Sequence, residues 1–160
     1  FLHCVTIYPT PFKELHLNRI QYLRKYTKNI GYSDHSSAMD ESKNLASMAS
    51  IYFGAKIIER HIRILSKDES RDGPVSIEPK EIGEIIKFSK LSKQKQKNQL
   101  LEMGLNFNLI KGKKIRPLSY EELLNREYYR GRFVSFSKND KRPIFNWDET
   151  DLWLNFMNHV

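Results

Sequence analysis

The first 90 residues alternate short apolar runs with amphipathic segments, and this order restricts the fold more than any other feature. Apolar runs typical of β-strands stand at residues 2–7, 29–33 and 55–64. Segments with apolar residues at helical spacing follow them, at residues 14–26, at residues 39–53 and from Glu78 onward. Strand–helix alternation with short connections predicts parallel strands in an α/β fold, with the helices on one side of the sheet.

The predicted helices also carry characteristic end residues. Gly54 follows the second helix and is expected to end it as a C-cap. The third helix opens with Glu78-Pro79-Lys80-Glu81, which places proline in the first turn and acids near the positive end of the helix dipole. A closed barrel of eight strand–helix units needs about 250 residues. The chain has 160 residues and therefore holds at most part of such a barrel.

Composition excludes several classes of protein. An aromatic content of 12% is too high for a disordered chain, and no apolar run approaches the roughly 20 residues of a membrane span. The single cysteine, Cys4, excludes an internal disulfide and a thiolate-only zinc site. It fits a reducing compartment, so a cytoplasmic protein is expected. The chain starts inside an apolar run without methionine, and we expect it to be a piece of a longer protein.

The net charge of +8 allows anionic partners such as nucleic acid or phosphorylated metabolites. Residues 87–116 hold nine basic side chains and one acidic residue, Glu102. We interpret this stretch as a solvated helix face followed by a loop. A basic nucleic-acid-binding protein is the alternative, and it predicts salt-sensitive binding to DNA or RNA.

Two histidines at predicted strand ends are the main candidates for chemistry. His35 ends the second strand and His61 lies near the end of the third. Ligands of parallel α/β sheets bind outside the C-terminal strand ends, and neighbouring strands are about 4.8 Å apart. Two imidazoles there can reach one divalent ion, and imidazole suits Mn, Fe, Co or Zn. The alternative, which spacing alone favours, is two histidines at the edge of the core with satisfied hydrogen bonds.

Strand alternation adds polar neighbours to each histidine. Ser33 shares a face with His35, and Glu59 shares one with His61. Polar side chains on these faces are costly in a core and reasonable at a site. Asp34 is expected either to accept a hydrogen bond behind a metal ligand or to be a loop acid.

Tyr8, at the end of the first strand, donates to a ligand oxygen or packs as an aromatic residue. Cys4, in an apolar strand, is expected to be inert. The sequence contains neither of the familiar glycine-rich loops that bind phosphate.

Four segments resemble the sialic acid synthases, in the order that this family has them. They are LHCVTIYPTP, IGYSDHSS, FGAKIIERHIRI and DGPVSIEPKEI, all within residues 1–91. This family includes the N-acetylneuraminate, legionaminic and pseudaminic acid synthases. Its members condense phosphoenolpyruvate with an N-acetylated hexose such as N-acetylmannosamine. The later segment PLSYEELLNREYYRGRFVSFSKND resembles the family's linker and the first strand of its antifreeze-like domain.

The resemblance implies a domain organisation. Residues 1–101 would be the last three βα units of a (β/α)8 TIM barrel, residues 102–131 a linker, and residues 132–160 a truncated antifreeze-like segment. The first five barrel units, with the family's phosphate-binding lysines and catalytic glutamate, are not in these 160 residues. Arg142 is a candidate for the arginine that, in the family, reaches a neighbouring subunit's site.

The resemblance also implies roles for individual residues. His35 and His61 match the family's two metal ligands, which typically hold Mn²⁺, with Mg²⁺ or Co²⁺ as alternatives. Ser33 matches a phosphoenolpyruvate contact and Tyr8 a contact near the sugar. In this chemistry the metal polarises the open-chain sugar aldehyde as a Lewis acid.

The sequence departs from the family pattern at three places. Thr6 stands where the family often has Asn or Ser, so a substrate hydrogen bond there is expected to differ. An acid that contacts the sugar usually follows Gly-Pro, where this chain has Val75; Asp72, just before Gly73, is the substitute candidate. The segment between His35 and His61 is a few residues longer than usual. These departures leave the identity of the sugar open.

The expected activity is that of a phosphoenolpyruvate-dependent, C–C bond-forming transferase that needs a missing N-terminal half. Alternatively, the chain is a catalytically inactive fragment, an assembly module of a split synthase, or the product of a decayed gene. The expected partners are the two substrates and a second copy of the chain, which binds through the C-terminal domain or the missing half. Neither nucleic acid nor membrane is expected as a partner.

Overall fold

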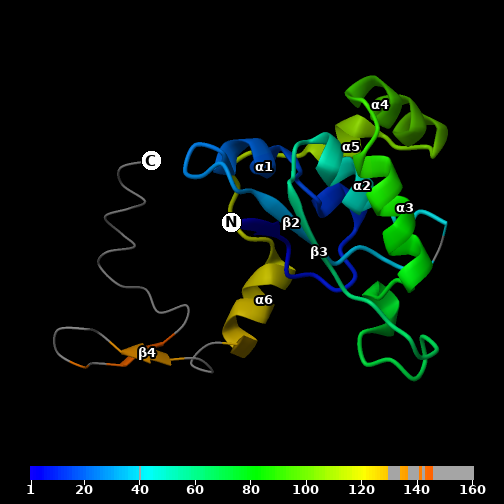
Figure 1. Cartoon of the computed structure of the whole chain (residues 1–160). Coiled ribbons are helices and arrows are strands. Elements are labelled where there is room, and N and C mark those ends of the chain that lie inside the picture. Colours follow the sequence, from blue (N-terminus) through cyan, green and yellow to red (C-terminus); the bar gives the residue numbers. More distant parts are fainter. Residues whose placement is uncertain (40, 130–133, 137–140, 142, 146–160) are drawn as a thin grey trace. The chain divides into compact units, whose positions relative to one another are not determined.

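The computed structural model describes residues 1–39, 41–129, 134–136, 141 and 143–145. The chain forms two compact units, Phe1–Pro117 and Leu118–Val160. Figure 1 shows the elements of both units, and all the strand-end residues discussed above belong to the first. Among the described residues, no helix is long and apolar enough to cross a membrane.

The first unit is built on a small parallel sheet. Its strands are β1 (Leu2–Cys4), β2 (Gly31–Asp34) and β3 (Ile57–Arg60), in the order β1-β2-β3. The helices α1 (Asn18–Leu23), α2 (Leu45–Tyr52) and α3 (Pro79–Ser89) follow them in turn. Figure 1 shows α2, α3 and α4 grouped on the same side of β3. The predicted α/β fold with parallel strands is therefore confirmed.

The two faces of the sheet differ in burial because successive residues of a strand point to opposite sides. On the helix side lie the buried side chains of His3, Tyr32 and Asp34. On the other side, Leu2 and Ile57 are exposed, although both are large and apolar. The register pairs Ser33 with Glu59 on this second face. Within the first unit, apolar side chains of α2 and α3 pack in one cluster with Tyr32, on the helix side of the sheet.

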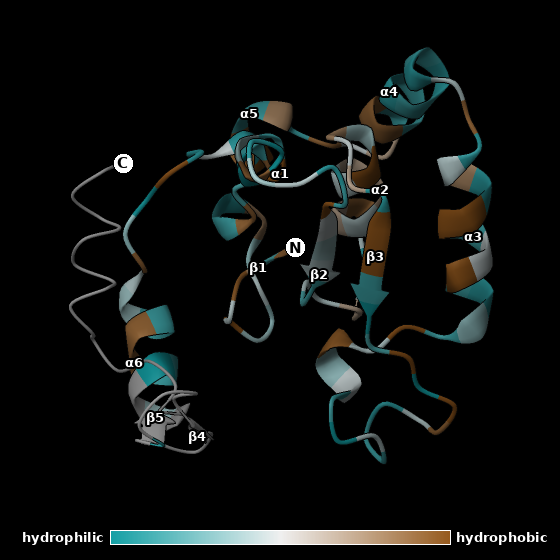
Figure 2. Ribbon diagram, turned by 60° about the vertical axis from the view of Figure 1, so that its left-hand side comes forward, coloured by the Kyte–Doolittle hydropathy of each residue, from teal (hydrophilic) through white to brown (hydrophobic). Residues whose placement is uncertain are grey.

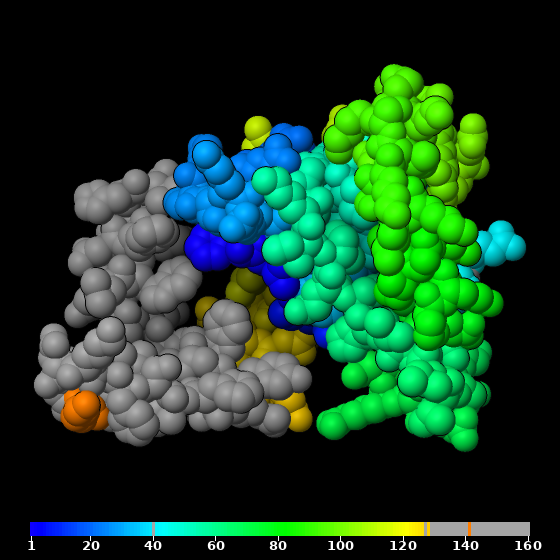
Figure 3. Space-filling model, in the orientation of Figure 1, coloured from blue at the N-terminus to red at the C-terminus, as the bar shows by residue number. Residues whose placement is uncertain are grey.

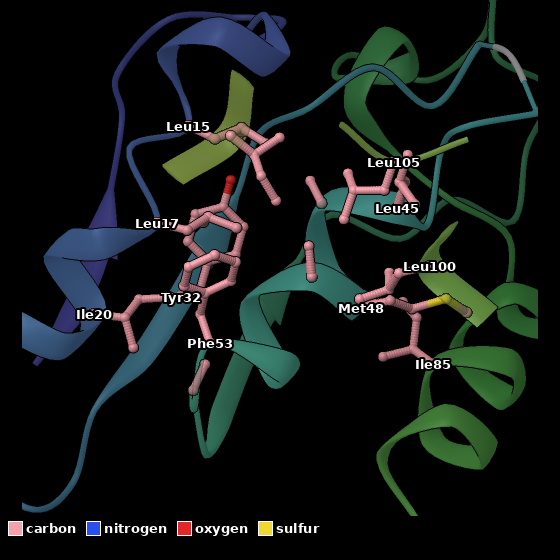
Figure 4. Close-up of a cluster of buried hydrophobic side chains, with 14 of the residues drawn as sticks. Leu15, Leu17, Ile20, Tyr32, Leu45, Met48, Phe53, Ile85, Leu100 and Leu105 are labelled. Atoms are coloured by element: carbon pink, nitrogen blue, oxygen red, sulfur yellow. The ribbon is translucent and has the colours of Figure 1, made fainter. Parts of the chain in front are cut away.

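The core of the first unit lies between the sheet and the helices. It draws apolar side chains from the segment after β1, from β2, from α2 and α3, and from the later helices (Figure 4). Its fully buried members include Leu15, Ile20, Tyr32, Phe88 and Leu100. Burying one such side chain contributes on the order of 1.5–3 kcal/mol, so this layer sets the stability of the unit.

The helix predicted over residues 14–26 is shorter and interrupted. A 3₁₀ turn spans Phe12–Glu14, and α1 begins only at Asn18. His16, between them, has a positive φ of 47°, which a regular helix does not allow. Leu17 donates its backbone N–H to the Ile110 carbonyl at 3.0 Å. Tertiary hydrogen bonding to the later segment thus replaces the first helical turn.

The predicted C-cap at Gly54 and helix start at Pro79 are confirmed, whereas the second helix, predicted to start at residue 39, begins only at Leu45. Gly54, with a φ of +102°, ends α2. The Gly54 N–H donates to the Ile51 carbonyl and the Ala55 N–H to the Ser50 carbonyl, each at 2.9 Å, which completes a Schellman motif. At α3, Glu78 and Glu81 form a reciprocal capping box.

The segment after α3 adds two helices to the first unit. Helix α4 (Lys93–Glu102) carries the lysine-rich stretch, and α5 (Phe107–Lys111) follows it. The Lys93 ammonium donates to the carbonyls of Ile51 and Tyr52 at 3.0 and 2.8 Å, so this lysine ties α4 to α2. Leu105 and Ile110 enter the core. The predicted linker, residues 102–131, therefore includes residues that pack in the first unit.

The second unit contains α6 (Tyr120–Tyr129), β4 (Val134–Phe136) and β5 (Pro143–Phe145). The two strands pair antiparallel, with Val134 opposite Phe145. Strand β4 thus lies within the segment that resembles the family's linker and the first strand of its antifreeze-like domain. Arg142 and residues 146–160 lie outside the described residues, and the antifreeze-like segment stays a prediction.

Candidate metal and substrate site

The C-terminal ends of the parallel strands meet at one edge of the sheet, and three rings gather there. In Figure 2 the arrowheads of β2 and β3 point to the same edge. The ring centroids of His35 and His61 are 5.5 Å apart. Tyr8, from the loop after β1, lies 4.2 Å from the His35 ring and 5.8 Å from the His61 ring. The structure therefore brings the two predicted histidines together with Tyr8.

Backbone contacts between loops hold Tyr8 in place. Thr10 donates its N–H to the His35 carbonyl at 2.8 Å, and its hydroxyl donates to the Ile7 carbonyl at 2.7 Å. Thr10 and Ser36 form a parallel bridge beyond the ends of β1 and β2. The loop that carries Tyr8 is thus closed against the segment that follows His35.

One hydrogen bond defines the protonation pattern of His35. Its Nδ1 lies 3.0 Å from the Val5 carbonyl oxygen and donates to it, since a carbonyl only accepts. In the neutral ring, Nε2 then carries the lone pair, and the Ser33 hydroxyl lies 3.3 Å from it. Burial lowers the pKa of His35 below its usual value, and the neighbouring His61 lowers it further. A neutral imidazole with a free Nε2 lone pair is the form that binds a metal.

His61 is oriented by a carboxylate and a phenol. Its Nδ1 lies 3.6 Å from Asp72 Oδ2, and its Nε2 lies 3.2 Å from the Tyr8 hydroxyl. Asp72 reaches the ring because the loop after β3 folds back. The Ile77 N–H donates to the His61 carbonyl at 2.9 Å, and Ile62 and Ile77 form a parallel bridge.

Val75 and Thr6 differ in what they offer to a ligand. Val75 is only 1% exposed and packs inside the unit. Asp72 is therefore the acid that this loop presents near His61. Thr6 is exposed and directly follows Val5, whose carbonyl accepts from His35.

The sheet face without helices carries two further polar groups and a thiol. The Ser33 hydroxyl donates to Glu59 Oε1 at 2.5 Å across the β2–β3 pair. Cys4 Sγ lies 3.8 Å from His35 Nδ1 on the same face. Alternation places these residues on one side of their strands, but only the register brings them into contact.

Sequence reasoning missed the partner of Asp34. The Asp34 carboxylate does not serve as an acceptor for His35, whose Nδ1 bonds to Val5 instead. Asp34 forms an ion pair with Arg60 at 2.8 Å, on the helix side of the sheet. Both side chains are almost fully buried. The signal in the sequence was an acid directly before His35 and a base directly before His61.

The site offers a metal two imidazole nitrogens. Within the described part of the chain, no group of three or more His, Cys, Asp or Glu side chains is arranged to hold a metal ion. Two imidazoles suit a first-row divalent ion. Each ring has its other nitrogen facing an oxygen, which is the arrangement typical of metal-ligating histidines. The residues fit a divalent ion whose remaining ligands are water, substrate or groups outside the described residues.

Comparison with known proteins assigns the family. Residues 1–99 match the model of the NeuB family, and the chain belongs to this family. The N,N'-diacetyllegionaminic acid synthase of Campylobacter jejuni is 37% identical over 82 residues, which are 51% of this chain and 23% of that protein. The human N-acetylneuraminate-9-phosphate synthase is 31% identical over 93 residues, which are 57% of this chain and 24% of that protein.

A solved structure shares the fold. The crystal structure of the spore coat polysaccharide biosynthesis protein SpsE of Bacillus subtilis aligns with a TM-score of 0.62 and 24% identity. The alignment covers 90% of this chain and 42% of that one. The matched segment is about a quarter of the length of the curated relatives.

Proposed function

We propose that this chain supplies the metal-binding edge of a sialic acid synthase-type active site. The reaction would condense phosphoenolpyruvate with an N-acetylated hexose resembling N-acetylmannosamine, giving a nonulosonic acid. One observation carries the proposal: in a NeuB family chain, the His35 and His61 ring centroids lie 5.5 Å apart at the C-terminal edge of a parallel sheet. The names of the relatives, which are acid synthases, support the same class of reaction.

The two histidines would hold the divalent ion through their Nε2 atoms. The Val5 carbonyl and the Asp72 carboxylate face the opposite nitrogens and orient the rings. We expect Mn²⁺, with Mg²⁺ or Co²⁺ as alternatives. When bound, the ion supplies Lewis-acid polarisation of the sugar aldehyde.

The remaining site residues would position the two substrates. Ser33 would contact phosphoenolpyruvate from the sheet face that carries Glu59. Tyr8, Thr6 and Asp72 lie on the loops around the histidines and would contact the sugar. In the reaction, the enol carbon attacks the aldehyde carbon and a C–C bond forms. Water then adds to the resulting oxocarbenium-like carbon, and phosphate leaves by C–O cleavage.

The surfaces of the first unit support completion by further strands. Parallel sheets are normally covered on both faces, whereas here the face with Leu2 and Ile57 is open. A groove of about 600 Å³ runs between β3 and α3, lined by Ile58, Ile62 and Ile86. Figure 3 shows residues of β3 and α3 next to one another at the surface.

A second groove, of about 390 Å³, lies beside β1 and is lined by Phe1, Leu2 and Leu23. When a few strand–helix units are taken from a larger repeating array, apolar grooves are exposed at both edges of their sheet, where further units would pack. We propose that these elements are the last three βα units of a (β/α)8 barrel. Strands outside these 160 residues would complete it, in the same polypeptide or in a separate one.

A chimera tests the activity. Residues 1–99 would replace the matching segment of the Campylobacter jejuni synthase, and phosphate release would be measured with Mn²⁺, phosphoenolpyruvate and a panel of N-acetylated hexoses. We expect release that depends on both metal and sugar. His35→Ala and His61→Ala should each abolish it, while Lys95→Ala, on the exposed side of α4, should not. A folded chimera that is inactive with every sugar, or equally active without His35, contradicts the proposal.

The 160-residue chain alone is the second arm of this experiment. We expect no turnover from it, because the proposed first five barrel units and their active-site groups lie outside these 160 residues. An assembly module without its own activity is the second candidate function, and the two edge grooves favour it. Such a module would restore phosphate release when mixed with a separate N-terminal half. Turnover by the chain alone would contradict the proposal that further strands are needed.

A further inference from the structure

We propose that the buried Asp34–Arg60 ion pair is a positioning device that sets the separation and direction of His35 and His61. The inference rests on the proposed metal-binding role of these histidines. Asp34 directly precedes His35, and Arg60 directly precedes His61. The two charged residues are partners in the β2–β3 register. They therefore form the last residue pair between β2 and β3 before the two histidines.

Arg60 connects several segments around this residue pair. Its Nη1 lies 2.8 Å from Asp34 Oδ1 and donates to the Asp34 carbonyl at 3.1 Å and the Ser36 hydroxyl at 3.2 Å. Its Nη2 donates to the Lys43 carbonyl at 3.1 Å. A single guanidinium thus ties the end of β3 to the end of β2 and to the loop that leads into α2.

Asp34, the other residue of the pair, is held by two further hydrogen bonds. Its Oδ1 accepts the Ser36 N–H at 2.8 Å, and its Oδ2 accepts the Ser47 hydroxyl of α2. The side chains of Asp34 and Arg60 are 0% and 2% exposed. Every contact of the pair lies on the helix side, so the histidines that follow turn to the open face.

Stability alone is a weak reason for this arrangement. The desolvation of a buried ion pair offsets much of its attraction, and apolar replacements of similar volume are often as stable. What the pair adds is direction, because the planar Arg60 guanidinium has its donors in a fixed geometry and must reach Asp34, Ser36 and Lys43 at once. A slip of one residue between β2 and β3 would move every side chain of one strand to the opposite face. The Asp34–Arg60 pair fixes the β2–β3 register and so prevents this slip.

The full chain with Asp34→Asn and Arg60→Met together tests the inference, since both charges are removed and no charge is left buried. A matched control is Lys43→Met with Glu81→Gln, which removes another ion pair with a buried carboxylate on the helix side. Circular dichroism and thermal unfolding report the fold. Nuclear Overhauser effects between the rings of Tyr8, His35 and His61 report the site without metal. Electron paramagnetic resonance of free Mn²⁺ reports the affinity.

We expect the Asp34/Arg60 variant to keep the fold, to lose the contacts between the rings, and to bind Mn²⁺ about 10- to 100-fold more weakly. The control should keep both. Unchanged ring contacts and Mn²⁺ affinity within twofold of the parent would overturn the inference. If the parent itself does not bind Mn²⁺, the proposed function fails, and the ring contacts still decide the role of the pair.

Arg60→Lys decides the matter if the double variant does not fold. Lysine keeps the charge but lacks the planar fork that serves Asp34 and Lys43 at once. We expect a folded protein with weakened ring contacts. Parent-like ring contacts in Arg60→Lys would overturn the inference.

Discussion

The two faces of the small parallel sheet are made by the same strands, yet they differ in burial and in the contacts of their side chains. On the helix side, Tyr32 and the Asp34–Arg60 pair are buried and make well-defined contacts. On the open side, Ser33 and Glu59 form a hydrogen bond next to exposed apolar side chains. One face therefore holds the fold, and the other presents groups to a ligand. Substitutions on the two faces should have effects of different kinds.

The largest loss of stability should follow Arg60→Met alone. This change leaves the Asp34 carboxylate buried without its counter-charge, which costs about 3–5 kcal/mol of unfolding free energy. Urea unfolding followed by circular dichroism measures it. The double variant with Asp34→Asn should recover most of the loss. A single variant as stable as the parent would show that the helix side does not depend on this pair.

The next effect concerns His3, which lies on the helix side of β1. Burial lowers its pKa from 6.5 to about 4, although its hydrogen bond to the Leu15 carbonyl opposes the shift. Between these values the unfolded chain binds the extra proton. The free energy of unfolding should therefore be steady above pH 6.5 and fall as the pH drops toward 4, by up to about 3 kcal/mol.

Urea unfolding at a series of pH values checks this dependence. His3→Gln keeps a donor for the Leu15 carbonyl and removes the titration, so its profile should be flatter in the same window. Equal slopes for parent and variant would place the pH dependence elsewhere in the protein.

On the open side, His35→Ala should act on metal binding rather than on the fold. Loss of one of two imidazole ligands should weaken Mn²⁺ binding at least about a hundredfold, or about 2.7 kcal/mol. The free Mn²⁺ resonance signal measures this loss, and circular dichroism should show a folded protein. Mn²⁺ retention equal to that of the parent would contradict the site assignment.

The smallest change in stability should come from Glu59→Gln. Its exposed carboxylate gains little from the Ser33 hydroxyl, and we expect a change within about 0.5 kcal/mol. Thermal unfolding measures it against Arg60→Met, the neighbouring residue on the opposite face. A loss as large as that of Arg60→Met would remove the contrast between the two faces.

Much of this site follows from local pattern. The alternation of strands and helices predicts a parallel sheet, and a parallel sheet brings the segments after its strands to one edge. That rule placed His35 and His61 at the same edge, and the resemblance to the sialic acid synthases then predicted that they share one site. The Gly54 cap and the helix start at Glu78-Pro79-Lys80-Glu81 are equally local, and the structure has both.

Other features depend on residues far apart in the chain. The helical pattern of residues 14–26 is interrupted at His16, because Leu17 bonds to Ile110 instead. Val75 stands where the family usually has an acid. Only the structure shows that Val75 is buried and that Asp72 is the acid near His61. No local pattern contains these distances.

The sequence by itself determined the strand order along the chain, the side of each strand that a residue occupies and the edge where the histidines lie, because these follow from backbone periodicity and parallel pairing. The tertiary structure alone decided that Val5 accepts from His35, that Asp72 faces His61 and that Arg60 pairs with Asp34. These contacts require loops and strands distant in sequence to converge within hydrogen-bonding distance, and only the packed core sets that convergence.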